Sequence, residues 1–154
     1  MDAGGYSMMT PFEVLNRILK GEHMAIQQYQ AYIDTLTDSP LRNHLTAILT
    51  DHKEHATRIA YYIQTNGGQA EEGAGFTGIM ADWKTRLMNL RETPPIEMIE
   101  RLYDGEDKGL ARAVQYSEQY LDSAQKEVLD PIFADEHDHL KQLQNLREGL
   151  YDNI

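Results

Sequence analysis

Residues 11–22 read PFEVLNRILKGE and residues 95–106 read PIEMIERLYDGE. The two segments share proline, glutamate, arginine, glycine and a final glutamate at an offset of 84 residues (95 − 11 = 84), and most apolar positions match apolar positions. The period is longer than that of a solenoid repeat and occurs only twice. The chain is therefore predicted to contain two related helical hairpins that arose by internal duplication.

Helix signals frame the first hairpin. Thr10, Pro11 and Glu13 have the pattern of an N-cap, a first helical residue and a capping-box glutamate. Apolar residues then recur with the spacing of one helical face, at Leu15, Ile18, Leu19, Ile26, Tyr29 and Ile33. The pattern stops at residues 38–40 (DSP), and a second helix is predicted to end at residues 66–68 (NGG), a usual C-terminal stop.

These signals predict an all-α, single-domain protein over residues 1–154. One antiparallel hairpin spans residues 11–66 and a second spans residues 95–150. The connection over residues 67–94 has 28 residues (94 − 67 + 1 = 28), which is too long for a hairpin loop. We therefore expect a four-helix bundle with one long crossover.

Composition limits the partners. The net charge of −11 disfavours a nucleic-acid backbone or an anionic membrane surface and is compatible with metal cations. There is no cysteine, so any metal must bind through nitrogen and oxygen. No apolar run approaches the roughly 20 residues of a membrane span, and the start MDAGGYSMMT lacks a signal-peptide pattern. We expect a cytoplasmic protein.

Six ionisable residues interrupt the apolar faces of the predicted helices: Glu22, His52, His55, Glu106, Glu136 and His139. Glu22 lies 16.5 positions before the first turn (38.5 − 22) and His55 lies 16.5 positions after it (55 − 38.5). Glu106 and His139 are equally spaced around a second turn (122.5 − 106 = 139 − 122.5 = 16.5). All six are expected to meet at one level inside the bundle.

Buried carboxylates cost several kcal/mol each unless they are paired or bound to a cation. A shared metal partner is therefore predicted for the six residues. Carboxylate and imidazole ligands without thiolate suit iron, manganese or zinc. Asp51 and Asp135 each precede a predicted histidine ligand, His55 and His139, by one helical turn. Each aspartate either accepts the distal ring proton of that histidine and fixes its tautomer, or is an ordinary acidic residue beside a buried apolar face.

The pattern resembles the ferritin-like di-iron carboxylate superfamily, in which two helices supply one Glu each and the other two supply Glu-x-x-His. Glu136 and His139 match the motif, whereas His52 stands where the second helix should supply glutamate. The segments GEH and GED (residues 21–23 and 105–107) and Trp83 in the crossover are similar to the small rubrerythrin-related branch without a rubredoxin domain. The resemblance implies a ferritin-like bundle with two iron ions, or manganese or zinc.

The same resemblance implies that the centre reduces peroxide or dioxygen, or oxidises Fe(II), with electrons from an external donor. His52 either ligates metal or hydrogen-bonds to Glu54 or another neighbour. Because few residues follow the fourth predicted helix, we expect a homodimer rather than a ferritin cage. The alternative from another class is a non-catalytic stress or scaffold bundle whose site has degenerated at His52 and holds zinc or nothing.

Overall fold

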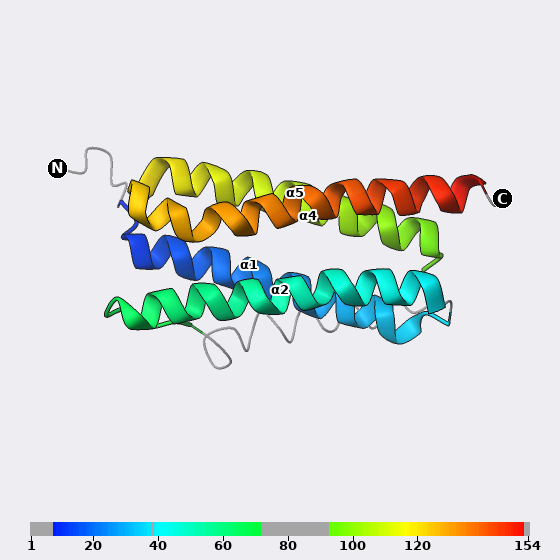
Figure 1. Cartoon of the computed structure of the whole chain (residues 1–154), viewed down its shortest axis with the longest axis horizontal. Coiled ribbons are helices and arrows are strands. Elements are labelled where there is room, and N and C mark those ends of the chain that lie inside the picture. Colours follow the sequence, from blue (N-terminus) through cyan, green and yellow to red (C-terminus); the bar gives the residue numbers. More distant parts are fainter. Residues whose placement is uncertain (1–7, 38, 72–92, 153–154) are drawn as a thin grey trace.

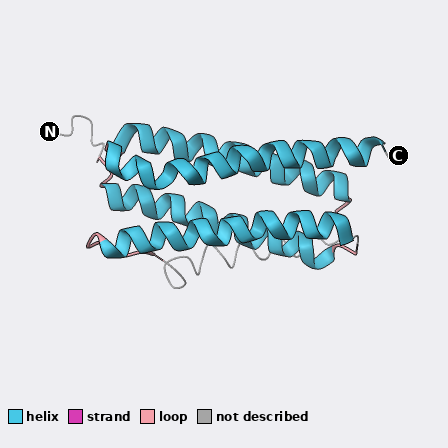
Figure 2. Cartoon of the chain, viewed as in Figure 1, coloured by secondary structure: helices cyan, strands magenta, loops and turns pink. Residues whose placement is uncertain are grey.

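The computed structural model describes residues 8–37, 39–71 and 93–152, and these form four α-helices and no strand. The helices are α1 (Pro11–Thr35), α2 (Ser39–Thr65), α4 (Pro95–Tyr120) and α5 (Ser123–Asp152). They lie lengthwise against one another as a four-helix bundle, shown along its length in Figure 1 and by secondary structure in Figure 2. The prediction of an all-α four-helix bundle is thus confirmed for the described residues.

The first helix begins as predicted. The Thr10 hydroxyl accepts a hydrogen bond from the Glu13 backbone N–H at 3.2 Å, and the Glu13 carboxylate accepts one from the Thr10 N–H at 3.3 Å. A second reciprocal pair, which the sequence analysis did not predict, joins Asp122 and Gln125 at the start of α5, at 2.8 and 2.9 Å. Each cap satisfies backbone N–H groups that the helix itself cannot, which stabilises the fold by about 1 kcal/mol.

The end of α2 also follows its sequence signal. Gly67 has a φ of +87°, a conformation that favours glycine, and the Gly68 N–H donates to the Ile63 carbonyl at 2.8 Å. A Cβ atom on Gly68 would lie 2.8 Å from Cγ of Phe12. The second glycine is therefore required by close packing against α1, as well as by the turn.

The bundle pairs α1 with α2 and α4 with α5, and it brings α1 against α4 and α2 against α5. In Figure 1, α2 ends at the left end of the bundle and α4 begins at the right end. The predicted crossover, residues 67–94, falls mostly on residues 72–92, which lie outside the described residues together with Trp83.

A proline lies inside α5. Pro131 has no N–H to donate to the carbonyl of Glu127, one turn earlier, so it removes a helical hydrogen bond. Its neighbours Leu129 and Ile132 are fully buried. Burial of these apolar side chains holds the helix against the bundle through the proline, and α5 continues to Asp152.

Two separate apolar clusters fill the interior. One includes Leu15, Leu19, Ile59, Ile63, Leu129 and Ile132, and the other includes Tyr32, Ile33, Leu45, Ile48, Ile99 and Leu143. Along every helix the residues of one cluster are separated from those of the other by the buried ionisable side chains. The polar level therefore lies in the middle of the bundle, sealed by apolar packing on both sides. No helix among the described residues combines the length and apolar composition that a membrane span requires.

Candidate metal centre

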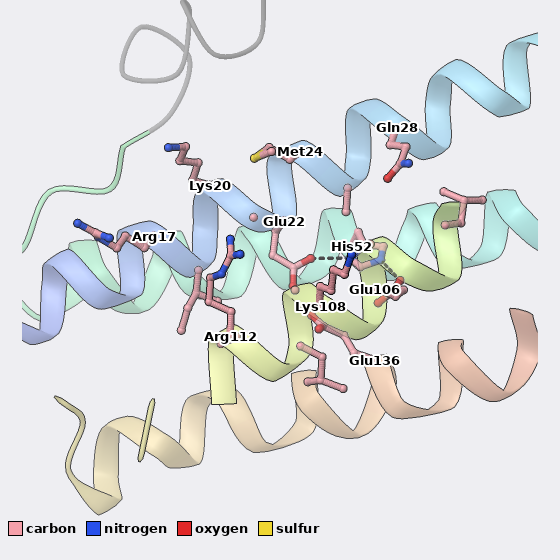
Figure 3. Close-up of a pocket in the computed structure, with 18 of the residues that line it drawn as sticks. Arg17, Lys20, Glu22, Met24, Gln28, His52, Glu106, Lys108, Arg112 and Glu136 are labelled. Atoms are coloured by element: carbon pink, nitrogen blue, oxygen red, sulfur yellow. Dashed lines mark hydrogen bonds and ion pairs between the residues drawn. The ribbon is translucent and has the colours of Figure 1, made fainter. Parts of the chain in front are cut away.

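The structure brings the six predicted residues together. Their exposed fractions run from 1% for His55 and His139 to 8% for Glu106. Glu22 comes from α1, the two histidines His52 and His55 from α2, Glu106 from α4, and Glu136 and His139 from α5. In Figure 3, Glu22, His52, Glu106 and Glu136 are drawn as sticks and converge between the helices. Four helices thus deliver three carboxyl groups and three imidazoles to one buried level.

His52 is the centre of this cluster. Its Nδ1 lies 2.6 Å from Oε2 of Glu22, and its Nε2 lies 2.6 Å from Oε1 of Glu106. Both ring nitrogens therefore face carboxylate oxygens, and both donate when the ring is an imidazolium. Glu54, the partner considered from sequence, is exposed and makes no hydrogen bond to His52 among the described residues. His52 joins the carboxylates of α1 and α4 instead.

The other two histidines are held by aspartates from the opposite hairpin. Nε2 of His55 donates to Oδ2 of Asp135 at 2.8 Å, and Nε2 of His139 donates to Oδ2 of Asp51 at 2.8 Å. The expectation that each aspartate serves the histidine one turn away on its own helix is therefore wrong. The α2 and α5 helices lie side by side at this level, and each aspartate reaches across to the neighbouring helix.

This arrangement leaves one nitrogen of each ring facing inward. Nδ1 of His55 lies 3.6 Å from Oε1 of Glu22 and 3.9 Å from Oε1 of Glu136, and Nδ1 of His139 lies 3.3 Å from Oε1 of Glu106. Neither Nδ1 atom has a hydrogen-bond partner among the described residues. Buried polar atoms normally have one, so these two nitrogens call for a further partner.

Two groups of side chains could each hold a metal ion. The first consists of Glu22, His52, His55 and Glu136, and the second of His52, Glu106 and His139. Within each group, one ligand atom from every residue lies within 4.8 Å of the others. His52 belongs to both groups, through opposite ring nitrogens. The cluster therefore has two halves with His52 between them.

The pKa values of the Glu22 and Glu136 carboxyl groups are shifted in opposite directions. Burial raises the pKa of Glu136, and the neighbouring Glu22 carboxylate raises it further, so Glu136 is protonated at neutral pH. Burial also raises the pKa of Glu22, but the neighbouring Glu136 carboxyl and the His52 and His55 rings outweigh burial and hold that pKa well below its usual range. One carboxyl of this half is thus neutral and one is ionised.

The remaining groups form an ion-pair network. Burial raises the pKa of Glu106, but the neighbouring His139 and His52 rings outweigh burial and lower it to about 2. Burial lowers the pKa of His52, yet Glu106 and Glu22 together raise it well above its usual value. The pKa of His139 is also raised, because Glu106 and Asp51 outweigh burial. Protons thus supply the positive charge that balances the buried carboxylates.

Tyr29 is a site residue that the sequence analysis did not assign. Its side chain is 1% exposed, its hydroxyl donates to Oε1 of Glu106 at 3.0 Å, and its ring centroid lies 5.3 Å from that of His52. Burial, followed by the negative charge of Glu106, raises the pKa of its hydroxyl. The only signal in the sequence was its place seven residues after Glu22, on the same helical face.

Histidines and a glutamate outside the apolar faces behave differently. His44, His137 and Glu54 are exposed, and His23 is half-buried. None of these four belongs to either candidate metal group within the described residues.

Residues 10–119 match a protein family described as a domain of unknown function (DUF2383). The match covers 110 of 154 residues (119 − 10 + 1 = 110), including α1, α2 and nearly all of α4. The comparisons found no match among curated proteins and none among solved structures. Glu136, His139 and Asp135, all on α5, lie beyond the matched residues.

Proposed function

The chain belongs to the DUF2383 family, and we propose that it is a ferritin-like metalloprotein with a di-iron or di-manganese centre. The proposed activity is reduction of peroxide or dioxygen, or oxidation of Fe(II). The observation that carries the proposal is the pair of buried Nδ1 atoms on His55 and His139, which point toward carboxylates and have no hydrogen-bond partner among the described residues.

The tautomers of these histidines suit metal binding. An Nε2 atom 2.8 Å from an aspartate oxygen carries the ring proton, so a neutral imidazole presents its lone pair on Nδ1. Hydrogen bonding of the distal nitrogen to a carboxylate also makes an imidazole a stronger metal ligand. Asp135 and Asp51 would therefore prepare His55 and His139 for the same task in the two halves of the cluster.

The rest of the donor set fits hard or borderline divalent ions. His55, Glu22 and Glu136 would hold one ion, and His139 with Glu106 would hold the other, without any thiolate. The protons now on Glu136, His52 and His139 would leave as the ions enter, because ligands bind metal in their deprotonated forms. The two apolar clusters would exclude water along the bundle axis on either side of the centre.

Two redox-active ions would supply the two electrons that, with two protons, convert one peroxide to two water molecules. Tyr29 would hold a proton at its phenol oxygen beside the ions, where the hydroxyl donates to Oε1 of Glu106. With no cysteine in the sequence, no Cys-ligated iron site can pass electrons to the centre. An external electron donor is therefore part of the proposal.

The proposal includes the duplicated-hairpin origin and a homodimer. Support for duplication comes from the reciprocal contacts at the 84-residue offset, since Asp51 and His139 mirror Asp135 and His55. The homodimer rests on sequence alone, and size-exclusion chromatography with light scattering tests it. A monomer or a large shell would contradict it.

The decisive experiment measures metal in the full chain after purification from iron- or manganese-supplemented cultures. The double variant Glu22→Ala, Glu106→Ala removes one carboxylate from each half and is expected to lose the bound metal. The matched control Glu54→Ala, Glu148→Ala changes the same charge at two exposed positions and is expected to retain it. Equal metal content in the wild type and the site variant would show that these residues are not ligands.

A second candidate, a non-catalytic scaffold, is favoured by His52. Its two contacts of 2.6 Å join Glu22 and Glu106 through hydrogen bonds, without a metal ion. Mixing the protein with Fe(II) in aerated buffer separates the two functions. Rapid growth of a ferric absorbance band that the Glu22→Ala, Glu106→Ala variant lacks supports the oxidoreductase. Absence of that band in wild type supports the scaffold.

A further inference from the structure

One cavity opens beside the candidate metal centre. It has a volume of about 510 Å³ and lies between α1 and α4. Its floor includes Glu22, His52, Glu106 and Glu136, so it connects the buried cluster with the protein surface (Figure 3). Its volume falls in the range of about 300–1,000 Å³ that is usual for small-molecule sites.

Small residues create this opening. Gly105, Gly109 and Ala113 follow one another at four-residue steps along α4, and Gly21 and Ala25 do the same on α1, so each set lies on one helical face that lines the cavity. A Cβ atom on Gly21 or Gly109 would meet no heavy atom within 4 Å. Gly21 and Gly109 therefore border open space at the cavity, whereas a Cβ atom on Gly105 would lie 3.4 Å from Oε1 of Gln28 on α1.

The mouth of the cavity is basic, although the protein is acidic. Four of the 14 lysines and arginines line it, namely Arg17, Lys20, Lys108 and Arg112. Lys108 pairs with Asp104 at 2.9 Å. Within residues 8–37, 39–71 and 93–152, no carboxylate lies in ion-pair distance of the other three. Uncompensated cations around one opening attract anions in a chain whose net charge is −11.

The walls between this rim and the floor are apolar. Ile18 on α1 and Leu110 and Tyr116 on α4 line the cavity. The cavity is thus lined by cations that are mostly exposed, and by apolar and ionisable side chains that are mostly buried. Such a lining matches a molecule with an anionic head group and a short apolar body, because the head group contacts the cations and the body contacts the apolar side chains.

We propose that the cavity between α1 and α4 binds a small monocarboxylate with a short aliphatic body. The carboxylate lies between Lys20 and Arg112, which come from opposite walls, and the aliphatic part packs on Ile18, Leu110 and Tyr116. This inference goes beyond the proposed function, because the rim binds the anion whether or not metal occupies the floor. In this proposal, the cavity is the route by which an organic ligand reaches the candidate metal centre.

Calorimetric titration of sodium octanoate into the full chain tests the proposal, on protein as purified and on protein dialysed against chelator. Saturable binding is expected in both, while octanol and octylamine bind at least about tenfold more weakly, because they lack the negative charge. The variant Lys20→Gln, Arg112→Gln is expected to weaken octanoate binding by about tenfold or more. The matched variant Lys53→Gln, Arg58→Gln, with both changes at exposed positions on α2, is expected to bind as wild type does.

A blocking variant separates the cavity from the surface charge. Gly109→Leu places a side chain in the open space and is expected to abolish octanoate binding with the helical circular dichroism spectrum retained, because leucine favours helix more than glycine does. Metal content of all variants is measured in parallel and does not enter this test. Absence of octanoate binding to wild type, equal binding of octanol, or unchanged binding in the rim variant or in a folded Gly109→Leu protein would each overturn the proposal.

Discussion

His52 on α2 and Glu136 on α5 occupy the same place in their respective halves of the chain (136 − 52 = 84), yet they do opposite things. His52 lies 2.6 Å from two carboxylates, which outweigh burial and raise its pKa well above the usual value, so they favour the cation. Burial and the neighbouring Glu22 carboxylate raise the pKa of Glu136 and favour its neutral form. A histidine at this position, in place of a glutamate, therefore supplies a counter-ion to the buried carboxylates. The charges of the polar level are balanced without a bound metal ion.

The largest effect on stability is expected when His52 is replaced by glutamate, so that both halves of the chain carry glutamate at this position. In the metal-free protein, His52→Glu removes the cation between Glu22 and Glu106 and adds a further carboxyl group, so the free energy of unfolding is expected to fall by about 3–5 kcal/mol. Added iron or manganese is expected to restore much of it, since the metal becomes the counter-ion. Urea denaturation with and without chelator measures both. His44→Glu, at an exposed position of α2, is the control, and equal stability of the two metal-free variants would refute the counter-ion role.

The crossed aspartates give the next effect. Asp51→Asn weakens the hydrogen bond to His139 and is expected to lower metal affinity about 10–100-fold in the half that contains His139. Asp135→Asn is expected to do the same in the half that contains His55. Competition with a chromogenic chelator resolves the two binding events. Metal-free stability should change little, because the Asp51 and Asp135 side chains are 41% and 46% exposed. Loss of both binding events in either variant would show that the halves are not independent.

The smallest effect concerns the proton on Glu136. Its folded-state pKa is raised above the ordinary value of 4.5, so its favourable contribution is complete below pH 4.5 and is lost as pH rises toward the folded-state pKa. Glu136→Gln keeps a neutral side chain and does not titrate. The metal-free variant is expected to be more stable than wild type by about 1 kcal/mol or more at neutral pH, with a shallower decline above pH 4.5.

Urea denaturation in chelator across pH 5–9 measures this slope. The lowered pKa of Glu106 acts in the opposite sense, since its contribution is present above pH 4.5 and is lost as pH falls toward 2, which lies outside that window. The Gln142→Glu variant, which changes a residue of the same helix in the reverse direction, controls for general charge effects. Identical slopes for wild type and Glu136→Gln would show that Glu136 is ionised in the folded protein.

Much of the site was predictable because the spacing of residues along a helix determines the face and the height at which their side chains lie. Glu22 and Glu106 stand within apolar stripes, and the count from each turn places them level with His55 and His139. The same reasoning misassigned Asp51 and Asp135, because both the adjacent turn of the same helix and the facing helix lie within reach of a short side chain. Tyr29 was placed only on the apolar face, since an aromatic residue there can either pack or donate a hydrogen bond.

The sequence alone determined the four helices, the capping box of α1, and the six ionisable side chains that face the interior, because helix periodicity and capping are local properties of the chain. Only the tertiary structure decided that His52 lies between Glu22 and Glu106, that each aspartate serves the other hairpin, and that α1 and α4 leave a cavity with a basic mouth. These features depend on how far each helix is rotated and separated from its neighbour. That distance is fixed by the packing of all four helices together, and no single helix encodes it.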